Sequence, residues 1–173
     1  MSERLLASDS IVYEEGFKPG YLGRMIQMQG EYYDVTWPVA GVSFEVMMAR
    51  QMCDFHDEHV PGRDLLLTAH CDGVLAGYIA VVGSEIERPG ARLRWFQVAE
   101  YYHDRGIGRE LLNRALDFCR RQGFKSAWLW TMDGLDAARH LYDSIGFKPV
   151  TSVHTPIPFH VPFHGDTLEL SLG

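Results

Sequence analysis

The chain has 173 residues, a formal net charge of -7 and a hydrophobic share of 46%. That length suits one compact domain, so we expect residues 1–173 to form a single unit. An acidic chain lacks the clustered Lys and Arg that bind phosphate backbones, which argues against a nucleic-acid partner. The apolar runs are too short to cross a bilayer, and the start, MSERLLASDS, lacks the plan of a secretory signal. We therefore expect a cytoplasmic protein with no membrane partner.

The first half predicts one strand followed by two helices. Residues 10–17 form a strand-like run, which Lys18-Pro19-Gly20 interrupts. Apolar residues then recur at helical spacing, first after Gly20 and again over residues 41–56.

A β-hairpin follows. The runs LLLTAHC and VLAGYIAVV flank Asp72-Gly73, whose backbone readily adopts the positive φ angles of a two-residue turn. Another strand-like run covers residues 91–100. The three cysteines, Cys53, Cys71 and Cys119, have no C-x-x-C spacing, and we expect reduced, mostly buried thiols.

The second half alternates helices and strands. A helical stripe runs from Ile107 until Gly123 supplies a left-handed stop, and SAWLWTM then predicts a buried strand. Asp133 is a candidate cap for the next helix, which Gly146 ends. Two strands, KPVTSVH and TLELSL, close the chain. The fold class is therefore α/β, with a mixed sheet and helices on both faces.

The turn Gly106-Ile107-Gly108 stands between a strand and a helix start, with Arg105 and Arg109 on either side. Unpaired amides and the helix dipole favour an anion there, and glycine leaves the backbone open to a phosphate. Arginine adds charge-assisted contacts. This pattern predicts a pyrophosphate cradle, although a tight loop that merely needs glycine explains the motif equally well. Neither the P-loop signature nor the full G-x-G-x-x-G is present.

The stretch VAEYYHDRGIGRELL, followed by a strand and AARHLYDSIGF, resembles the acyl-CoA-binding half of the GNAT superfamily of N-acetyltransferases. More closely, WLWTMDGLDAARHLYDSIGFKPV and KPGYLGRMIQMQGEYY are similar to the acetyltransferase domain fused behind MarR-type DNA-binding domains in some bacterial regulators. The resemblance implies the order strand, two helices, three strands, helix, strand, helix, two strands. It also implies acetyl-CoA as co-substrate and a primary amine as acceptor.

The resemblance also implies roles for single residues. The cofactor pyrophosphate would rest on the backbone of Arg105, Gly106, Ile107, Gly108 and Arg109. The pantetheine arm would run beside Gln97, Val98 and Ala99, and near Ala138 and Leu141; pairing of its amides with a strand edge resembles strand addition. Tyr142, in the motif LYDSIGF, would protonate the leaving thiolate.

Further roles rest on less specific signals. An N–H near Val98 would polarise the thioester carbonyl. Glu100 is the candidate base, with His103 or a water chain as alternatives. The acceptor pocket is expected at Glu31, Tyr33 and Trp37, together with Tyr32 and Asp34, where aromatic side chains and carboxylates combine. The spacing of His154, His160 and His164 fits no standard metal site, so none is predicted.

Three functions stay open at this point. The first is an N-acetyltransferase, with contact to a second copy of the chain left open. The second is a non-catalytic acyl-CoA-binding or regulatory module, because His103, Asp104 and Leu135 depart from the family pattern. The third is a nucleotide-binding protein that uses the same glycine turn.

Overall fold

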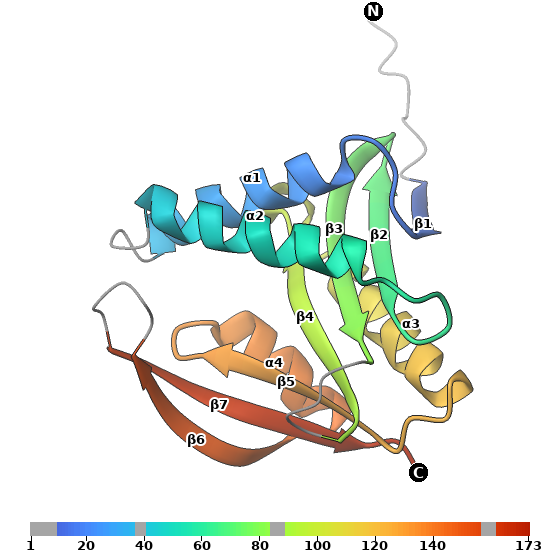
Figure 1. Ribbon diagram of the computed structural model, residues 1–173, viewed down its shortest axis with the longest axis vertical. Helices are drawn as coiled ribbons and strands as arrows, with labels where there is room; N and C mark the ends of the chain where they lie inside the picture. The colour runs from blue at the N-terminus through green and yellow to red at the C-terminus, as the bar shows by residue number, and fades with distance from the viewer. Residues whose placement is uncertain (1–9, 37–40, 84–88, 157–161) are drawn as a thin grey trace, which may run out of the picture.

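The computed structural model describes residues 10–36, 41–83, 89–156 and 162–173. These residues form one seven-stranded sheet in the order β1-β2-β3-β4-β5-β7-β6, with helices on both faces (Figure 1). The elements are β1 (Ile11–Glu15), α1 (Tyr21–Thr36), α2 (Gly41–Asp57), β2 (Leu65–Cys71), β3 (Val74–Val82), β4 (Ala91–Val98), the short 3-10 helix η1 (Glu100–Tyr102), α3 (Ile107–Arg121), β5 (Ser126–Met132), α4 (Asp136–Ile145), β6 (Lys148–Pro156) and β7 (Pro162–Ser171). The expected order of strands and α-helices is confirmed.

Two separate cores cover the two faces of the sheet. On one face, α1 and α2 bury Met25, Met48 and Met52 against strand residues such as Leu66 and Tyr78. On the other, α3 buries its apolar stripe, and α4 adds Tyr142, against the opposite side of the strands. The α3 stripe is the predicted one: Leu111, Leu112, Ala115, Leu116 and Cys119 are all buried.

The β2–β3 hairpin has the predicted turn. Asp72 and Gly73 take φ angles of 50° and 78°, which match the twist of the flanking antiparallel strands. The predicted stop of α3 is confirmed as well, since Gly123 adopts φ 81° just beyond the helix.

One local prediction is wrong. Asp133 does not cap α4: the helix begins at Asp136, its N-cap is Leu135, and no side chain bonds the cap position. The Asp133 N–H instead donates to the His164 carbonyl oxygen at 3.1 Å. This bond ties the segment before α4 to β7.

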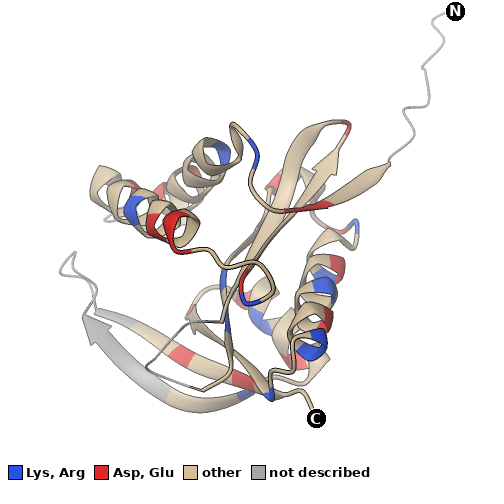
Figure 2. Ribbon diagram, turned by 45° about the vertical axis from the view of Figure 1, so that its right-hand side comes forward, with Lys and Arg blue, Asp and Glu red and all other residues tan. Residues whose placement is uncertain are grey.

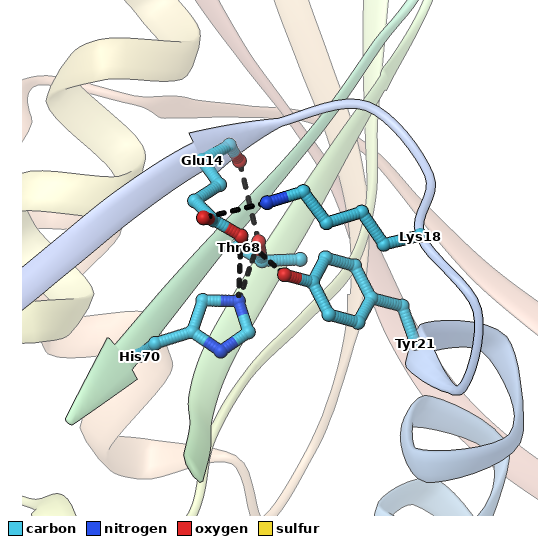
Figure 3. A network of polar contacts seen from close by, with 5 residues as sticks. All are labelled: Glu14, Lys18, Tyr21, Thr68 and His70. Carbon is cyan, nitrogen blue, oxygen red and sulfur yellow. Dashed lines mark hydrogen bonds and ion pairs between the residues drawn. The ribbon is translucent and has the colours of Figure 1, made fainter. Parts of the chain in front are cut away.

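A polar network joins the start of α1 to the β1 edge of the sheet (Figure 3). The Glu14 carboxylate accepts hydrogen bonds from Lys18 Nζ, at 2.7 Å, and from the Tyr21 hydroxyl. Thr68 Oγ1 donates to the Glu14 carbonyl oxygen at 3.2 Å, and His70 Nε2 lies 3.0 Å from that hydroxyl. The network therefore fixes the first turn of α1, at the end remote from Tyr33.

Basic and acidic residues are interspersed along α3, as the blue and red segments of its ribbon show in Figure 2. On that helix Arg114 pairs with Glu110 at 2.7 Å and Arg120 pairs with Asp117 at 2.8 Å. Among the described residues, no helix is long and apolar enough to cross a membrane.

Candidate active site

A cleft opens where β4 and β5 separate. The two strands are parallel and pair only at Ala91–Ala127 and Arg92–Trp128. Beyond these pairs they diverge, and a cavity of about 740 Å³ lies at the separation. A slot therefore opens beside the end of β4.

A bulge in β4 turns the strand at this point. The register against β3 shifts between Tyr78 and Ala80, so that Trp95 and Phe96 together lie opposite one residue of β3. Trp95 takes φ 51°, a left-handed conformation that is rare for a bulky residue. Phe96 lines the cleft beyond the bulge.

The glycine turn forms one end of the cleft. Gly106 is the N-cap of α3 with φ 77°, and the first amide to bond within the helix is that of Glu110, which donates to the Gly106 carbonyl oxygen. The amides of Ile107, Gly108 and Arg109 precede it and have no acceptor within the helix. All four residues from Gly106 to Arg109 line the cleft. The turn can thus offer a row of N–H groups to an anion.

The departures from the family pattern are accommodated in this turn. Asp104 adopts φ 60°, a conformation for which glycine is common and which aspartate tolerates. His103 Nε2 lies 2.9 Å from the Val98 carbonyl oxygen, and because a carbonyl only accepts, this nitrogen carries the proton. His103 thereby ties the turn to the end of β4.

The two arginines beside the glycines differ in position. Arg109 lines the cleft, and its Nη2 donates to Ser144 Oγ on α4 at 3.1 Å. Arg105 does not line the cleft; its guanidinium lies over the rings of Tyr101 and Tyr102, 5.5 Å from each centroid.

The end of β4 presents one residue's backbone to the cleft. The Ala99 N–H donates to the Ala76 carbonyl oxygen at 2.8 Å, so it points toward β3. Backbone groups alternate along a strand, so the N–H and C=O of Val98 point the opposite way, toward the gap beside β5. Gln97 lines the cleft, and its side chain is held toward α1, because its Nε2 donates to the Met28 carbonyl oxygen at 3.0 Å. Val98 is thus the residue of the three whose backbone groups face the gap.

Tyr142 lies inside the cleft wall and is 6% exposed. Its ring packs against Phe96 and Phe147, with centroids 6.0 and 5.8 Å away. Burial, and to a smaller extent the Tyr33 phenol, raises the pKa of Tyr142 far above its ordinary value. The phenol therefore stays protonated at neutral pH, and its O–H is present as a hydrogen-bond donor. Ala138 and Leu141 of α4 line the cleft beside it.

Of the residues predicted as base or acceptor pocket, some line the cleft and others do not. Tyr33 lines the cleft, whereas Glu31 is exposed and accepts a hydrogen bond from Gln27 at 2.6 Å. Glu100 is exposed in η1 and does not line the cleft. Trp37 lies outside the described residues. Within the part of the chain that the structure describes, no group of three His, Cys, Asp or Glu could hold a metal ion.

Several lining residues had no prediction attached to them. They are Gln29 of α1, Phe96 of β4, Tyr102 of η1, and Gly134, Asp136 and Ala137 at the start of α4. Tyr32, which was named with Tyr33 for the acceptor pocket, lines the cleft as well. One signal for Gln29 was present, since Gln29, Tyr32 and Tyr33 have the spacing of one helix face.

Comparison with known families gives a match over most of the chain. The model described as Acetyltransferase (GNAT) family matches residues 24–147. The Xenopus tropicalis protein named "Probable N-acetyltransferase camello" is 32% identical over 80 residues, which cover 46% of this chain and 36% of that protein. N-acetyltransferase family 8 member 3 of Rattus norvegicus is 35% identical over 83 residues, with the same coverage. The chain thus matches about a third of the length of these curated relatives.

Solved structures share the whole architecture. The acetyltransferase yncA of Salmonella typhimurium, solved with its cofactor acetyl-CoA, superposes with a TM-score of 0.75 at 17% identity, covering 94% of each chain. A GNAT-family acetyltransferase of Desulfovibrio desulfuricans gives 0.74 at 15% identity, covering 95% of this chain and all of that one. At these identities the likeness establishes the fold.

Proposed function

Because this chain belongs to the GNAT family of acetyltransferases, we propose that it transfers the acetyl group of acetyl-CoA to a primary amine of a small molecule or protein. One observation carries the proposal. A single cleft joins the open N-terminus of α3 to the protonated phenol of Tyr142, across the gap between β4 and β5. Such a cleft suits an elongated substrate with an anionic end and a reactive end.

The residues of the cleft fit acetyl-CoA. The amides of Gly106 to Arg109 would hold the pyrophosphate, and the Arg109 guanidinium would add charge-assisted contacts. The Val98 carbonyl oxygen, which has a second lone pair beside its bond from His103, would accept from an amide N–H of the pantetheine arm, while Ala138 and Leu141 would supply apolar contacts. Gln97, Ala99 and Arg105 stay predicted cofactor contacts. The Gln97 amide bonds to α1, the Ala99 N–H bonds to β3, and the Arg105 guanidinium lies over Tyr101 and Tyr102.

The chemistry follows from two donors near the thioester. The neutral amine attacks the acetyl carbon while the Val98 N–H stabilises the negative charge that develops on the carbonyl oxygen. The C–S bond then breaks, and the Tyr142 hydroxyl donates its proton to the departing sulfur. The attacking nitrogen loses one proton to a base. Tyr142 has given one proton to the sulfur and regains one before the next turnover, so the number of protons is unchanged. Glu100 remains the candidate base, acting through water, because its side chain lies outside the cleft.

The test is calorimetric titration with acetyl-CoA, followed by thiol release with a panel of amines. A Gly108→Val variant checks the cradle, since a Cβ at Gly108 would lie 3.3 Å from Phe96 Cζ and 3.6 Å from Val98 Cγ2. We expect binding by the wild-type chain and an affinity at least about tenfold weaker in the variant. Gly23→Ala, on the open surface of α1, is the matched control. Equal affinity for the wild type and Gly108→Val would remove the cradle from the proposal.

A non-catalytic acyl-CoA-binding module is the second candidate. It is favoured by two of the departures from the family pattern, which both line the cleft: Leu135, and His103, which already bonds the Val98 carbonyl oxygen. Tight binding of acetyl-CoA without thiol release from any amine would support this alternative.

The sequence also led to expectations about domain organisation, location and oligomeric state. We propose that residues 1–173 form one acetyltransferase domain. The closer resemblance to MarR-fused acetyltransferase domains, a cytoplasmic location and a homodimer stay predictions.

A further inference from the structure

We propose that the acceptor amine is carried on a neutral apolar group, preferably a planar one, and that Gln29, Tyr32 and Tyr33 select it. These three residues are called the α1 wall below. The inference rests on the proposed acetyltransferase function and names the class of amine that the same cleft would take.

The α1 wall lies across the sheet from the glycine turn. Helix α1 packs on one face of the sheet, whereas α3 and α4 pack on the other. The cleft is lined from both sides, because β4 and β5 have separated there. With the cofactor on the N-terminus of α3, the α1 wall is the part of the cleft left for the acceptor.

The wall offers aromatic surface on a firm support. The Tyr33 ring packs on Phe44 of α2 with centroids 4.6 Å apart, and Tyr32 stands edge-on to Tyr33 at 5.2 Å. Tyr32 is 39% exposed, so much of its ring can contact a bound molecule. Aromatic faces of this kind bind apolar and planar groups.

The wall also lacks negative charge. The carboxylates of α1 nearest to it, Glu31 and Asp34, are exposed and do not line the cleft. Asp104 and Asp136 do line it, but they belong to the helix starts on the other face of the sheet. Burial raises the pKa of Tyr33 far above its ordinary value, so its phenol is neutral. A polyamine would therefore find no carboxylate on the α1 wall to hold its second ammonium.

A buried network fixes the α1 wall relative to β4, the strand whose end would face the thioester. The Tyr78 hydroxyl donates to Gln97 Oε1 at 2.6 Å and lies 3.1 Å from the Met25 carbonyl oxygen. Gln97 Nε2 donates to the Met28 carbonyl oxygen at 3.0 Å. Through these bonds, Tyr78 of β3 and Gln97 of β4 are joined to the carbonyl oxygens of Met25 and Met28, which lie one turn apart on α1. The wall is thus formed before the acceptor arrives, which lowers the entropic cost of binding a rigid group.

The test uses two conjugates of CoA whose sulfur carries the group CH₂–CO–NH–R. In one, R is 2-phenylethyl; in the other, R is 4-aminobutyl and ends in an ammonium. Dissociation constants of both conjugates and of CoA are measured by calorimetry on the full chain. We expect the phenylethyl conjugate to bind at least about tenfold more tightly than CoA, as burial of an aromatic ring predicts. The aminobutyl conjugate should bind within about threefold of CoA, because a desolvated ammonium gains no paired charge there.

Two variants locate the effect. Tyr32→Ala should remove most of the phenylethyl gain and leave the affinity for CoA unchanged. Val35→Ala is the matched control, because Val35 is 82% exposed on the same helix and does not line the cleft. An aminobutyl conjugate that binds as tightly as the phenylethyl one, or a phenylethyl conjugate that binds no better than CoA, would overturn the inference. Failure of CoA itself to bind would instead overturn the proposed function.

Discussion

Tyr142 carries the proposed acid step, and its burial defines a clear test. Tyr142→Phe removes the hydroxyl and keeps the ring that packs on Phe96 and Phe147. We expect kcat to fall by about 100-fold, the usual contribution of a general acid. The measurement is the rate of thiol release across a range of pH.

The affinity for acetyl-CoA is the control for that variant. Since the proposed cradle lies at Gly106 to Arg109, the dissociation constant should stay within about twofold of the wild-type value when only a phenol is removed. An unchanged kcat at every pH would show that another group protonates the sulfur.

Asp64 is a residue whose charge supports the fold rather than the cleft. It is 3% exposed, and its carboxylate accepts from the Val60 N–H at 2.9 Å, the Gly83 N–H at 2.8 Å and Arg63 Nε at 3.0 Å. Burial alone would raise the pKa of Asp64, but these hydrogen bonds outweigh it and lower the pKa below 3.8. We expect Asp64→Asn to reduce the free energy of unfolding by about 1–3 kcal/mol at pH 7.

The pH dependence gives this prediction a second readout. A lowered pKa contributes stability that is present above the unfolded-state pKa, near 3.8, and is lost as the pH falls through the lower folded value. Urea unfolding should therefore show the wild-type advantage at pH 7 and a smaller advantage below about pH 4. An advantage that is independent of pH would mean that shape, not charge, sets the contribution of Asp64.

At the scale of elements, two glycines with equal space around them should respond in opposite ways to alanine. A Cβ would meet nothing within 4 Å at Gly73 or at Gly23. Gly73 has φ 78° in the hairpin turn, whereas Gly23 lies within α1 and has no positive φ. Gly73→Ala should lower the free energy of unfolding by about 1 kcal/mol, and Gly23→Ala should raise it by about 0.5–1 kcal/mol. Denaturant unfolding of both variants is the measurement, and the same sign for both would refute this account.

The elements that the sequence predicted best are those with local signals. The hairpin depends on Asp72-Gly73, and α3 depends on its own stripe and on Gly123, so each could be inferred without knowing its neighbours. The start of α4 could not, because the Asp133 N–H bonds to His164, which is 31 residues away and on another strand. The bulge at Trp95 follows from the register between β3 and β4, which no local pattern reveals.

The candidate site divides in the same way. Tyr142 and the glycine turn belong to continuous motifs and were predicted from them. Gln29 was missed because its place in the cleft depends on how α1 crosses the sheet and on where β4 separates from β5. That geometry is a property of the assembled fold.

At the scale of the whole molecule, the gap between β4 and β5 divides the sheet into two parts, β1 to β4 and β5-β7-β6. A ligand bound in the cleft would contact the end of β4 and helix α4, which follows β5 in the chain, and would stabilise the native state by mass action. At 100 times its dissociation constant, acetyl-CoA should raise the free energy of unfolding by about 2.7 kcal/mol. Thermal unfolding with and without ligand measures this gain, and amide exchange should slow most at Val98 and at the first turn of α3.

The Gly108→Val variant is the control for that experiment. It should lose most of the gain while its unfolding without ligand stays cooperative. If the variant gained as much as the wild type, acetyl-CoA would have to bind elsewhere on the molecule.

The burial of the cysteines has a practical consequence for any assay that detects freed CoA with a disulfide reagent. Cys53 is exposed on α2, whereas Cys71 and Cys119 are buried, and burial raises the pKa of the Cys119 thiol to about 12. Only thiolates react quickly with such reagents. In the folded protein, one thiol per chain, that of Cys53, should therefore react rapidly with the reagent and add to the signal from freed CoA. Cys53→Ser would remove this background, and the later appearance of the two buried thiols would report the onset of unfolding during the assay.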